Sequence, residues 1–342
     1  MFFKEVFGID LGSDTVKIYS LKKDEILIEK NMIAIRDGDE VIAVGNDAYE
    51  MYEKSPRSIT VSSPMNNGMI ANIGHLEVVL HVLLRKVSRR FRKRPIVYFS
   101  APVNMSEIEK RAYHAVASGG DLRNSRIFLV ERPIVHALAN GIPIMKSKGS
   151  MIADLGAEST ELSIIADNRV IISKLVLIGG NDIDQAIIDQ VRKNCSLGIS
   201  HRTAIRLKTA LAGFVTDQGD ARKVVGVDMV SGLPREAIVP AKVVNDAMRS
   251  VIDRITDAIL QFLEQTPPQI QNNILKEGIC ITGGCTKIEG LAPYLAGKTS
   301  CAVRKSQYAD LSDVYGLKEI ITHKALQHWA VSAKSRRNRY RY

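Results

Sequence analysis

Residues Ile9–Ile18 read IDLGSDTVKI, and residues Ala153–Leu162 read ADLGAESTEL. Each segment has an apolar residue, then Asp-Leu-Gly, then a short polar run and a return to alternating apolar residues. Such alternation on both sides of a glycine-containing turn predicts two antiparallel strands. A third strand-like segment follows in each case. We therefore predict the same meander twice, with strands at residues 6–11, 16–21, 24–29 and again at 150–155, 160–166, 170–177.

Strands and helices alternate through the rest of the chain. Apolar spacing predicts helices at residues 75–87, 134–141, 180–195 and 241–264 and from about residue 289, and buried strands within 95–102, 126–133 and 276–284. Asp182 is placed to cap the helix that follows Gly179–Gly180. A charged section without clear periodicity occupies residues 196–240. The alternation predicts an α/β fold, and the repeated meander predicts two related lobes that meet near Lys146–Gly149.

The composition is that of an ordinary globular protein. Of the 342 residues, 45% are apolar and 25% charged, and no run of 18 apolar residues predicts a membrane-spanning helix. The N-terminus runs into a strand pattern without a long apolar region, so we predict no signal peptide. The four cysteines have no metal-ligand spacing, which favours reduced thiols in a cytoplasmic protein over disulfides or zinc.

The net charge of +10 is concentrated in two segments. Residues 85–94 hold seven Arg and Lys residues around Phe91, and residues 334–342 hold five beside Tyr340 and Tyr342. Clustered charge with aromatic residues suits an anionic surface, either lipid head groups or nucleic acid. A solvated loop and a frayed tail are the alternative.

The two turns offer the groups that bind phosphate. A tight turn after a buried strand exposes backbone N–H groups, and small hydroxyl residues add donors. A carboxylate at the strand end can hold Mg²⁺ through water, a role open to Asp10 and Asp154. Lys17 can reach a phosphate as a point charge. A third turn with Gly283 and Gly284, in ITGGCTKIEG, would let a nucleoside approach the backbone. Three such turns predict one nucleotide held from two sides.

This order of turns resembles the actin-like ATPase superfamily, and the chain is similar to its MreB family of bacterial rod-shape-determining proteins over nearly its whole length. The similarity extends to the segments between the turns, which other superfamily members do not share. These segments are Val44–Pro56, Pro64–Asn72, Phe128–Ile144, residues 178–193, residues 199–211 and residues 266–284.

The resemblance implies a two-lobed actin-like (ribonuclease H-like) fold with duplicated mixed-sheet domains around a nucleotide cleft. We expect lobe I at residues 1–146 with a smaller insertion at about 30–75. Lobe II is expected at residues 147–342, with an insertion at about 180–240 and with the C-terminal helix and basic tail. The cofactors implied are ATP and Mg²⁺. The nucleotide-binding residues implied are Asp10, Gly12, Ser13, Asp14, Thr15, Lys17, Gly156, Ala157, Glu158, Ser159, Thr160, Lys208, Gly283, Gly284 and Cys285, with Asp10 and Asp154 at the metal.

The partners and location implied are also those of the family. They are further copies of the chain in a filament, other actin-like family members and membrane proteins of cell-wall elongation. The basic segment falls where the family presents a membrane-facing loop, so we expect Arg90, Phe91 and Arg92 to meet the anionic inner face of the membrane. For this basic segment we favour attachment to a membrane over binding to nucleic acid.

The chain departs from the family pattern in its catalytic region. The family's connecting helix begins Glu-Glu-Pro, and its second Glu positions the attacking water, whereas this chain has Glu131-Arg132-Pro133. An arginine cannot act as a general base. Glu158 lies in a turn that is normally all glycine, Cys285 replaces a glycine, and Ala210 replaces an acidic residue.

These departures lead to three interpretations of the function and to one hypothesis about two residues. The leading interpretation is a membrane-associated filament subunit for cell shape and guidance of cell-wall synthesis, with weak or lost ATP hydrolysis. The alternatives are an active ATPase in which Glu131 takes over the water, and a non-polymerising adaptor. The catalytic residues implied are Glu131, Arg132 at the family's catalytic Glu position, and Asp154. We also hypothesise that Arg132 and Glu158 form an ion pair across the cleft, with independent drift of both residues as the alternative.

Overall fold

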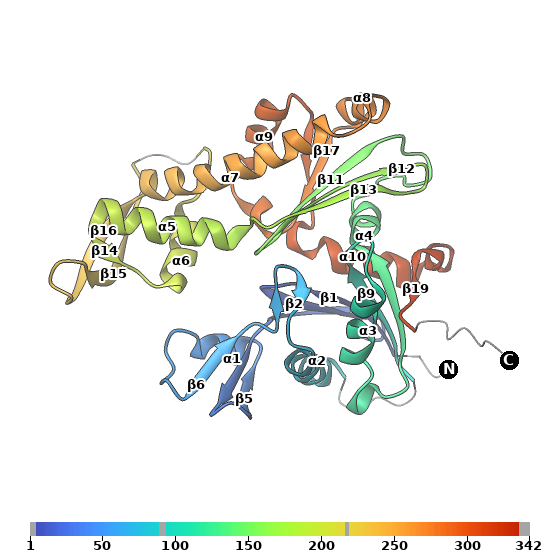
Figure 1. Cartoon of the computed structure of the whole chain (residues 1–342), viewed down its shortest axis with the longest axis horizontal. Coiled ribbons are helices and arrows are strands. Elements are labelled where there is room, and N and C mark those ends of the chain that lie inside the picture. Colours follow the sequence, from blue (N-terminus) through green and yellow to red (C-terminus); the bar gives the residue numbers. More distant parts are fainter. Residues whose placement is uncertain (1–4, 89–93, 216–218, 335–342) are drawn as a thin grey trace. The chain divides into compact units, whose positions relative to one another are not determined.

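A computed structural model describes residues 5–88, 94–215 and 219–334 of the chain, which divides into two compact units (Figure 1). Unit 1 comprises Met1–Ile144 and Leu311–Tyr342, and unit 2 comprises Met145–Asp310. The C-terminal helix therefore belongs to the first unit, whereas the sequence analysis placed it in the second lobe. The division of the chain at residue 144 lies close to the expected boundary.

Unit 1 is built on a six-stranded sheet with the order β19-β10-β9-β1-β2-β3. β1 pairs antiparallel with β2 and parallel with β9, and β10 continues the parallel part of the sheet. The predicted strands of the first meander are confirmed. The strands are β1 Val6–Leu11, β2 Thr15–Ser20, β3 Glu25–Lys30, β9 Ile96–Ala101, β10 Arg126–Glu131 and β19 Val331–Ser332.

Strand alternation gives this sheet two different faces. Phe7, Ile9 and Leu11 of β1 join a buried cluster with the apolar residues of α2 (Ile73–Val87), and α3 (Glu107–Val116) packs beside α2. The intervening residues of β1, β9 and β10 point to the opposite face, which α10 (Ser312–Thr322) covers. This second face carries Asp10 and Ser100, which are register partners on β1 and β9.

Close packing explains why the C-terminal helix joins unit 1. α10 lies against α4 (Arg132–Ala139), and a Cβ atom at Gly316 would lie 1.9 Å from the carbonyl oxygen of Val135. Only glycine permits this approach of the two backbones. α10 also packs on β1, β2 and β9, so its apolar face is buried within unit 1.

Smaller elements complete unit 1. A three-stranded sheet of order β5-β4-β6 and a short hairpin follow β3 in the chain. Their bounds are β4 Ile33–Arg36, β5 Glu40–Val44, α1 Asn46–Met51, β6 Ile59–Ser62, β7 Met65–Asn66 and β8 Met69–Ile70. The 3-10 helices of this unit are η1 Gly120–Leu122, η3 Ala309–Leu311 at the junction between the units, and η4 Lys324–Trp329.

Unit 2 repeats the plan with a five-stranded sheet of order β13-β12-β11-β17-β18. The second meander and the helix predicted at 241–264 are confirmed, and the charged section at 196–240 contains a helix and a hairpin. The elements are β11 Ser150–Leu155, β12 Thr160–Ala166, β13 Arg169–Val176, α5 Gly180–Cys195, β14 Leu197–Gly198, α6 His201–Leu211, β15 Ala221–Asp228, β16 Pro234–Pro240, α7 Ala241–Glu264, α8 Pro268–Glu277, β17 Ile279–Thr282, η2 Gly284–Lys287, α9 Leu291–Thr299 and β18 Val303–Lys305.

Helices α5 and α7 pack on one another around a core rich in Ile, Leu and Val, and α7 also packs on strands β12 and β13. In the parts of the chain that the structure describes, every helix is too short or too polar to cross a lipid bilayer.

Candidate functional site

The first turn, between β1 and β2, is held by backbone bonds and by neighbouring strands. The N–H of Gly12 donates to the carbonyl of Thr15 at 3.1 Å, and the N–H of Gly68 donates to the Ser13 hydroxyl at 3.2 Å. Asp14 is exposed, and Lys30 of β3 donates to its carboxylate at 2.7 Å. The turn is therefore fixed before any ligand is bound, which lowers the entropy cost of binding at its amides.

Asp10 and Lys17 form a buried ion pair at the base of this turn. They face each other in the β1–β2 register, and Lys17 Nζ lies 2.7 Å from Asp10 Oδ2. Burial raises the pKa of the Asp10 carboxyl, while Lys17 and then Arg132 act in the opposite direction and Asp313 adds to the rise. The sequence analysis predicted both residues of this pair as site residues.

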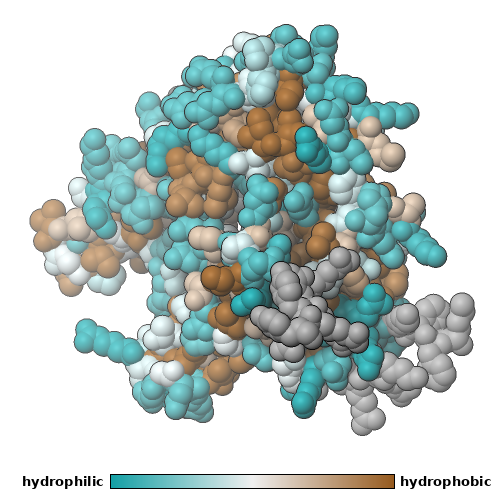
Figure 2. All heavy atoms as spheres, turned by 45° about the vertical axis from the view of Figure 1, so that its right-hand side comes forward, coloured by the Kyte–Doolittle hydropathy of each residue, from teal (hydrophilic) through white to brown (hydrophobic). Residues whose placement is uncertain are grey.

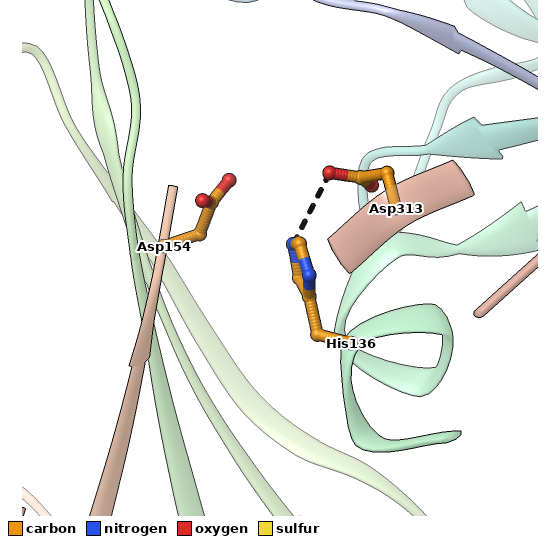
Figure 3. A group of neighbouring side chains, drawn as sticks. All are labelled: His136, Asp154 and Asp313. Carbon is orange, nitrogen blue, oxygen red and sulfur yellow. Dashed lines mark ion pairs between the residues drawn. The ribbon is translucent and has the colours of Figure 1, made fainter. Parts of the chain in front are cut away.

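Arg132 begins α4 and is buried, with 9% of its surface exposed, on the face of the sheet that α10 covers. Its Nε atom lies 3.6 Å from Asp313 Oδ1, and His136, one turn further along α4, places Nε2 3.6 Å from Asp313 Oδ2 (Figure 3). The Ser100 hydroxyl donates to the same aspartate. Glu131, which precedes Arg132, has an exposed side chain.

Asp313, His136 and Ser100 were missed by the sequence analysis. Asp313 lies in a helix whose sequence, SDVYGLKEIIT, gives no sign that its second residue is buried against a distant arginine. The signal for Ser100 was available, because it is a polar residue at the end of a buried strand, in register with Asp10. His136 follows Arg132 by four residues and so lies on the same helix face.

The second turn, between β11 and β12 of unit 2, binds the start of α5. The Gly180 N–H donates to the Gly156 carbonyl at 3.0 Å, and the Asn181 N–H donates to the Ala157 carbonyl at 2.7 Å. The predicted cap is confirmed, because the Asp182 carboxylate accepts from the Gly179 N–H at 2.8 Å. Glu158 and Ser159 complete the turn with partly exposed side chains, and Thr160 donates its hydroxyl to the Ile178 carbonyl at 2.9 Å.

Lys208 of α6 contacts the start of α5, and Cys285 of η2 reaches the second turn. Lys208 Nζ donates to the Gly180 carbonyl at 3.0 Å and to Asp184 at 2.7 Å. The Cys285 thiol lies 3.4 Å from the Gly156 carbonyl, and burial raises the pKa of Cys285 to about 11. The thiol therefore stays neutral and is a poor nucleophile. The structure thus brings together Gly156, Lys208 and Cys285, three residues that are far apart in the sequence.

The third turn lies beside the second because β17 pairs with β11. Gly283 has a φ angle of +89°, and a Cβ atom there would lie 2.4 Å from the Leu155 carbonyl oxygen and 2.6 Å from Asp154 Oδ1. Asp154, one residue before the end of β11, is partly exposed and is also labelled in Figure 3. Gly284 has open space where a side chain would stand.

Two groups of predicted site residues remain predictions. The membrane residues Arg90, Phe91 and Arg92 lie outside the described residues. The Arg132–Glu158 ion pair would join unit 1 to unit 2, while the structure gives Arg132 a carboxylate, that of Asp313, inside unit 1.

The comparisons with known proteins identify the family of the chain. The model of the MreB/Mbl protein family matches residues 4–328 of the chain. The chain belongs to the MreB/Mbl family. The cell shape-determining protein MreB of Escherichia coli K12 is 32% identical over 309 residues, which are 88% of this chain and 88% of that protein.

Solved structures of actin-like proteins share the fold. MreB 5 of Spiroplasma citri bound to AMPPNP has a TM-score of 0.88 and 25% identity, with 96% of this chain and 98% of that chain covered. The MamK double helical filament has a TM-score of 0.76 and 17% identity, with 94% of this chain and 99% of that chain covered. The predicted two-lobed actin-like α/β fold is therefore confirmed for this MreB/Mbl family member.

Proposed function

We propose that this MreB/Mbl family member is a cell-shape filament subunit that binds ATP with Mg²⁺ and hydrolyses it slowly or not at all. The observation that carries the proposal is the burial of Arg132 against Asp313, at the position where the family resemblance places the water-positioning glutamate. A guanidinium group remains protonated at neutral pH and accepts no proton. The function in cell shape follows the name of the Escherichia coli relative.

Nucleotide binding is supported by the two preformed turns and by Lys17, and by the AMPPNP that MreB 5 of Spiroplasma citri binds. We propose that the first and second turns bind the phosphates of one nucleotide. Asp10 and Asp154 lie one residue before the ends of equivalent strands, and their carboxylate oxygens are the ligand type that Mg²⁺ prefers. When bound, Mg²⁺ would neutralise phosphate charge, and these two residues would hold it through water.

Self-association is supported by exposed apolar residues on the β15–β16 hairpin. Val225 and Val227 of β15 and Ile238 of β16 lie on one face of the hairpin, and they are 60%, 48% and 67% exposed. Val230 and Leu233, in the connecting turn, are 90% and 66% exposed. Figure 2 shows apolar atoms gathered at the far left, where this hairpin lies. Apolar patches of this kind mark interaction surfaces, and the MamK filament shows that the fold can polymerise.

The filament proposal predicts that Val230→Asp with Leu233→Asp raises the protein concentration needed for pelleting roughly tenfold, because two exposed apolar residues that would be buried between subunits become charged. The measurement is sedimentation of the full chain with AMPPNP, with ADP and without nucleotide. Ile108→Asp, a change at a residue 77% exposed on α3, is the matched control. Failure of the unmodified chain to pellet in all three conditions would favour the non-polymerising adaptor.

Peripheral attachment to the inner membrane face is the last part of the proposal. It rests on the basic segment around Phe91, where each Arg near an anionic surface contributes about 1 kcal/mol. Arg90→Ser with Arg92→Ser is expected to reduce flotation with vesicles that contain anionic lipid, and Arg111→Ser with Arg123→Ser, two exposed arginines of unit 1, to leave it unchanged. Equal flotation with neutral and anionic vesicles would contradict the proposed electrostatic attachment to anionic lipid.

A further inference from the structure

A pocket of about 420 Å³ lies in unit 1 where α10 ends. The parallel strands β1, β9 and β10 begin at Val6, Ile96 and Arg126, so their first residues lie at the same end of the sheet. α10 covers the sheet as far as Ile321, whose side chain lies over Gly8. Beyond it the chain turns into η4, and the pocket is lined there by Gln327 of η4 and by Ala330, the residue that follows η4.

The floor of this pocket is apolar and aromatic. Val6, Ile96, Tyr98 and Phe128 line it from the sheet, and Ile321 lines it from α10. The Tyr98 and Phe128 rings stack with their centroids 5.1 Å apart. The volume falls within the roughly 300–1,000 Å³ that is usual for small-molecule sites.

Three polar groups lie on the wall of the pocket. The Arg126 guanidinium lies 5.2 Å from the centroid of the Phe128 ring and is exposed, and Gln327 of η4 adds an amide. Burial raises the pKa of the Tyr98 hydroxyl, with Arg126 acting in the opposite direction, so Tyr98 is a neutral donor at physiological pH. The η4 sequence, KALQHW, contains no carboxylate. The polar side of the pocket therefore carries positive charge and hydrogen-bond donors.

We propose that this pocket binds an amphiphile with one apolar chain and one anionic head group, of the fatty-acid type. The chain packs against Ile96, Phe128 and Ile321, and the head group accepts hydrogen bonds from Arg126. An arginine stacked on an aromatic ring is held in one orientation, so it can bind a carboxylate through two N–H groups. This site is separate from the turns proposed to bind nucleotide, which contain none of its lining residues.

The only tryptophan of the chain reports on this pocket. Trp329 lies in η4, directly before the lining residue Ala330. The experiment titrates the full chain with dodecanoate below its micelle concentration and follows Trp329 fluorescence, with calorimetry for stoichiometry. We expect a saturable change with one site per chain, and much weaker binding of dodecanol, which lacks the charge.

Arg126→Gln is expected to weaken dodecanoate binding roughly tenfold, since it removes a charge-assisted hydrogen bond. Arg123→Gln, an exposed arginine that does not line the pocket, is the control and should bind as the unmodified chain does. Ala330→Phe places a ring in the pocket and should abolish binding. Thermal melting confirms that each variant is folded.

Three results would overturn the proposal. They are equal binding of dodecanol and dodecanoate, equal binding by Arg126→Gln and the unmodified chain, and binding that appears only after removal of residues 1–4. The last result would show that the N-terminal segment of the chain, not an amphiphile, occupies the pocket.

Discussion

Replacement of Asp313 with asparagine is expected to lower the free energy of unfolding of unit 1 by about 3 kcal/mol. The change leaves the Arg132 guanidinium buried without the carboxylate that lies 3.6 Å from its Nε atom. Asparagine can still accept the hydrogen bond from Ser100, so the loss of stability measures the effect of removing the negative charge. The measurement is urea unfolding followed by the fluorescence of Trp329, which lies in unit 1.

Three further variants separate the ion pair from a general effect of mutation. Asp24→Asn removes an exposed aspartate that pairs with Lys318 of α10 and should leave the unfolding midpoint unchanged. Arg132→Met should destabilise alone, whereas Arg132→Met with Asp313→Asn should recover much of the loss, because neither charge then remains buried alone. Additive losses in the double variant would show that the two residues do not act as a pair.

The second large effect concerns hydrolysis. Arg132→Glu combined with Asp313→Asn is expected to accelerate phosphate release from ATP by roughly 10²-fold, the lower end of what a positioned general base contributes. Arg132→Glu restores the residue type that the family resemblance implies. Asp313→Asn removes the carboxylate that would otherwise repel the new glutamate at the same contact. The measurement is single-turnover phosphate release by the full chain. Asp24→Asn serves again as the control.

The repeated meander could be predicted from sequence because its signals are local. Strand alternation on both sides of a glycine turn fixes β1 to β3 and β11 to β13 without knowledge of any distant residue. α7 was predicted with its observed bounds because its apolar residues keep helical spacing, and Pro267–Pro268 follow shortly after its end.

Long-range contacts could not be predicted in the same way. The amphipathic pattern of α10 indicates a helix but does not say which unit buries it. The partner is decided by the absence of a side chain at Gly316, where the helix meets the backbone of Val135. For the same reason, the burial of Asp313 against Arg132 could not be predicted from the sequence of the helix.

Only part of the candidate site could be predicted, because some of its residues are neighbours in one hairpin and others meet only through tertiary packing. Asp10 and Lys17 lie in one hairpin, so their pairing follows from strand register. The nucleotide-binding role of Lys208 and Cys285 came from the family resemblance, whereas their positions near the second turn depend on the tertiary packing of α6 and η2 and could not be predicted. The Arg132–Glu158 ion pair stays a prediction, and the contact of Arg132 with Asp313 could not be predicted because the two residues lie far apart in the sequence.

ATP binding and phosphate release, measured together on the unmodified chain and on Glu131→Gln, test the central claim most directly. The account predicts that both proteins bind ATP in the presence of Mg²⁺ and release phosphate at the same low rate, because the exposed Glu131 does not replace the missing glutamate. Rapid release by the unmodified chain that Glu131→Gln abolishes would contradict the account and establish the chain as an active ATPase.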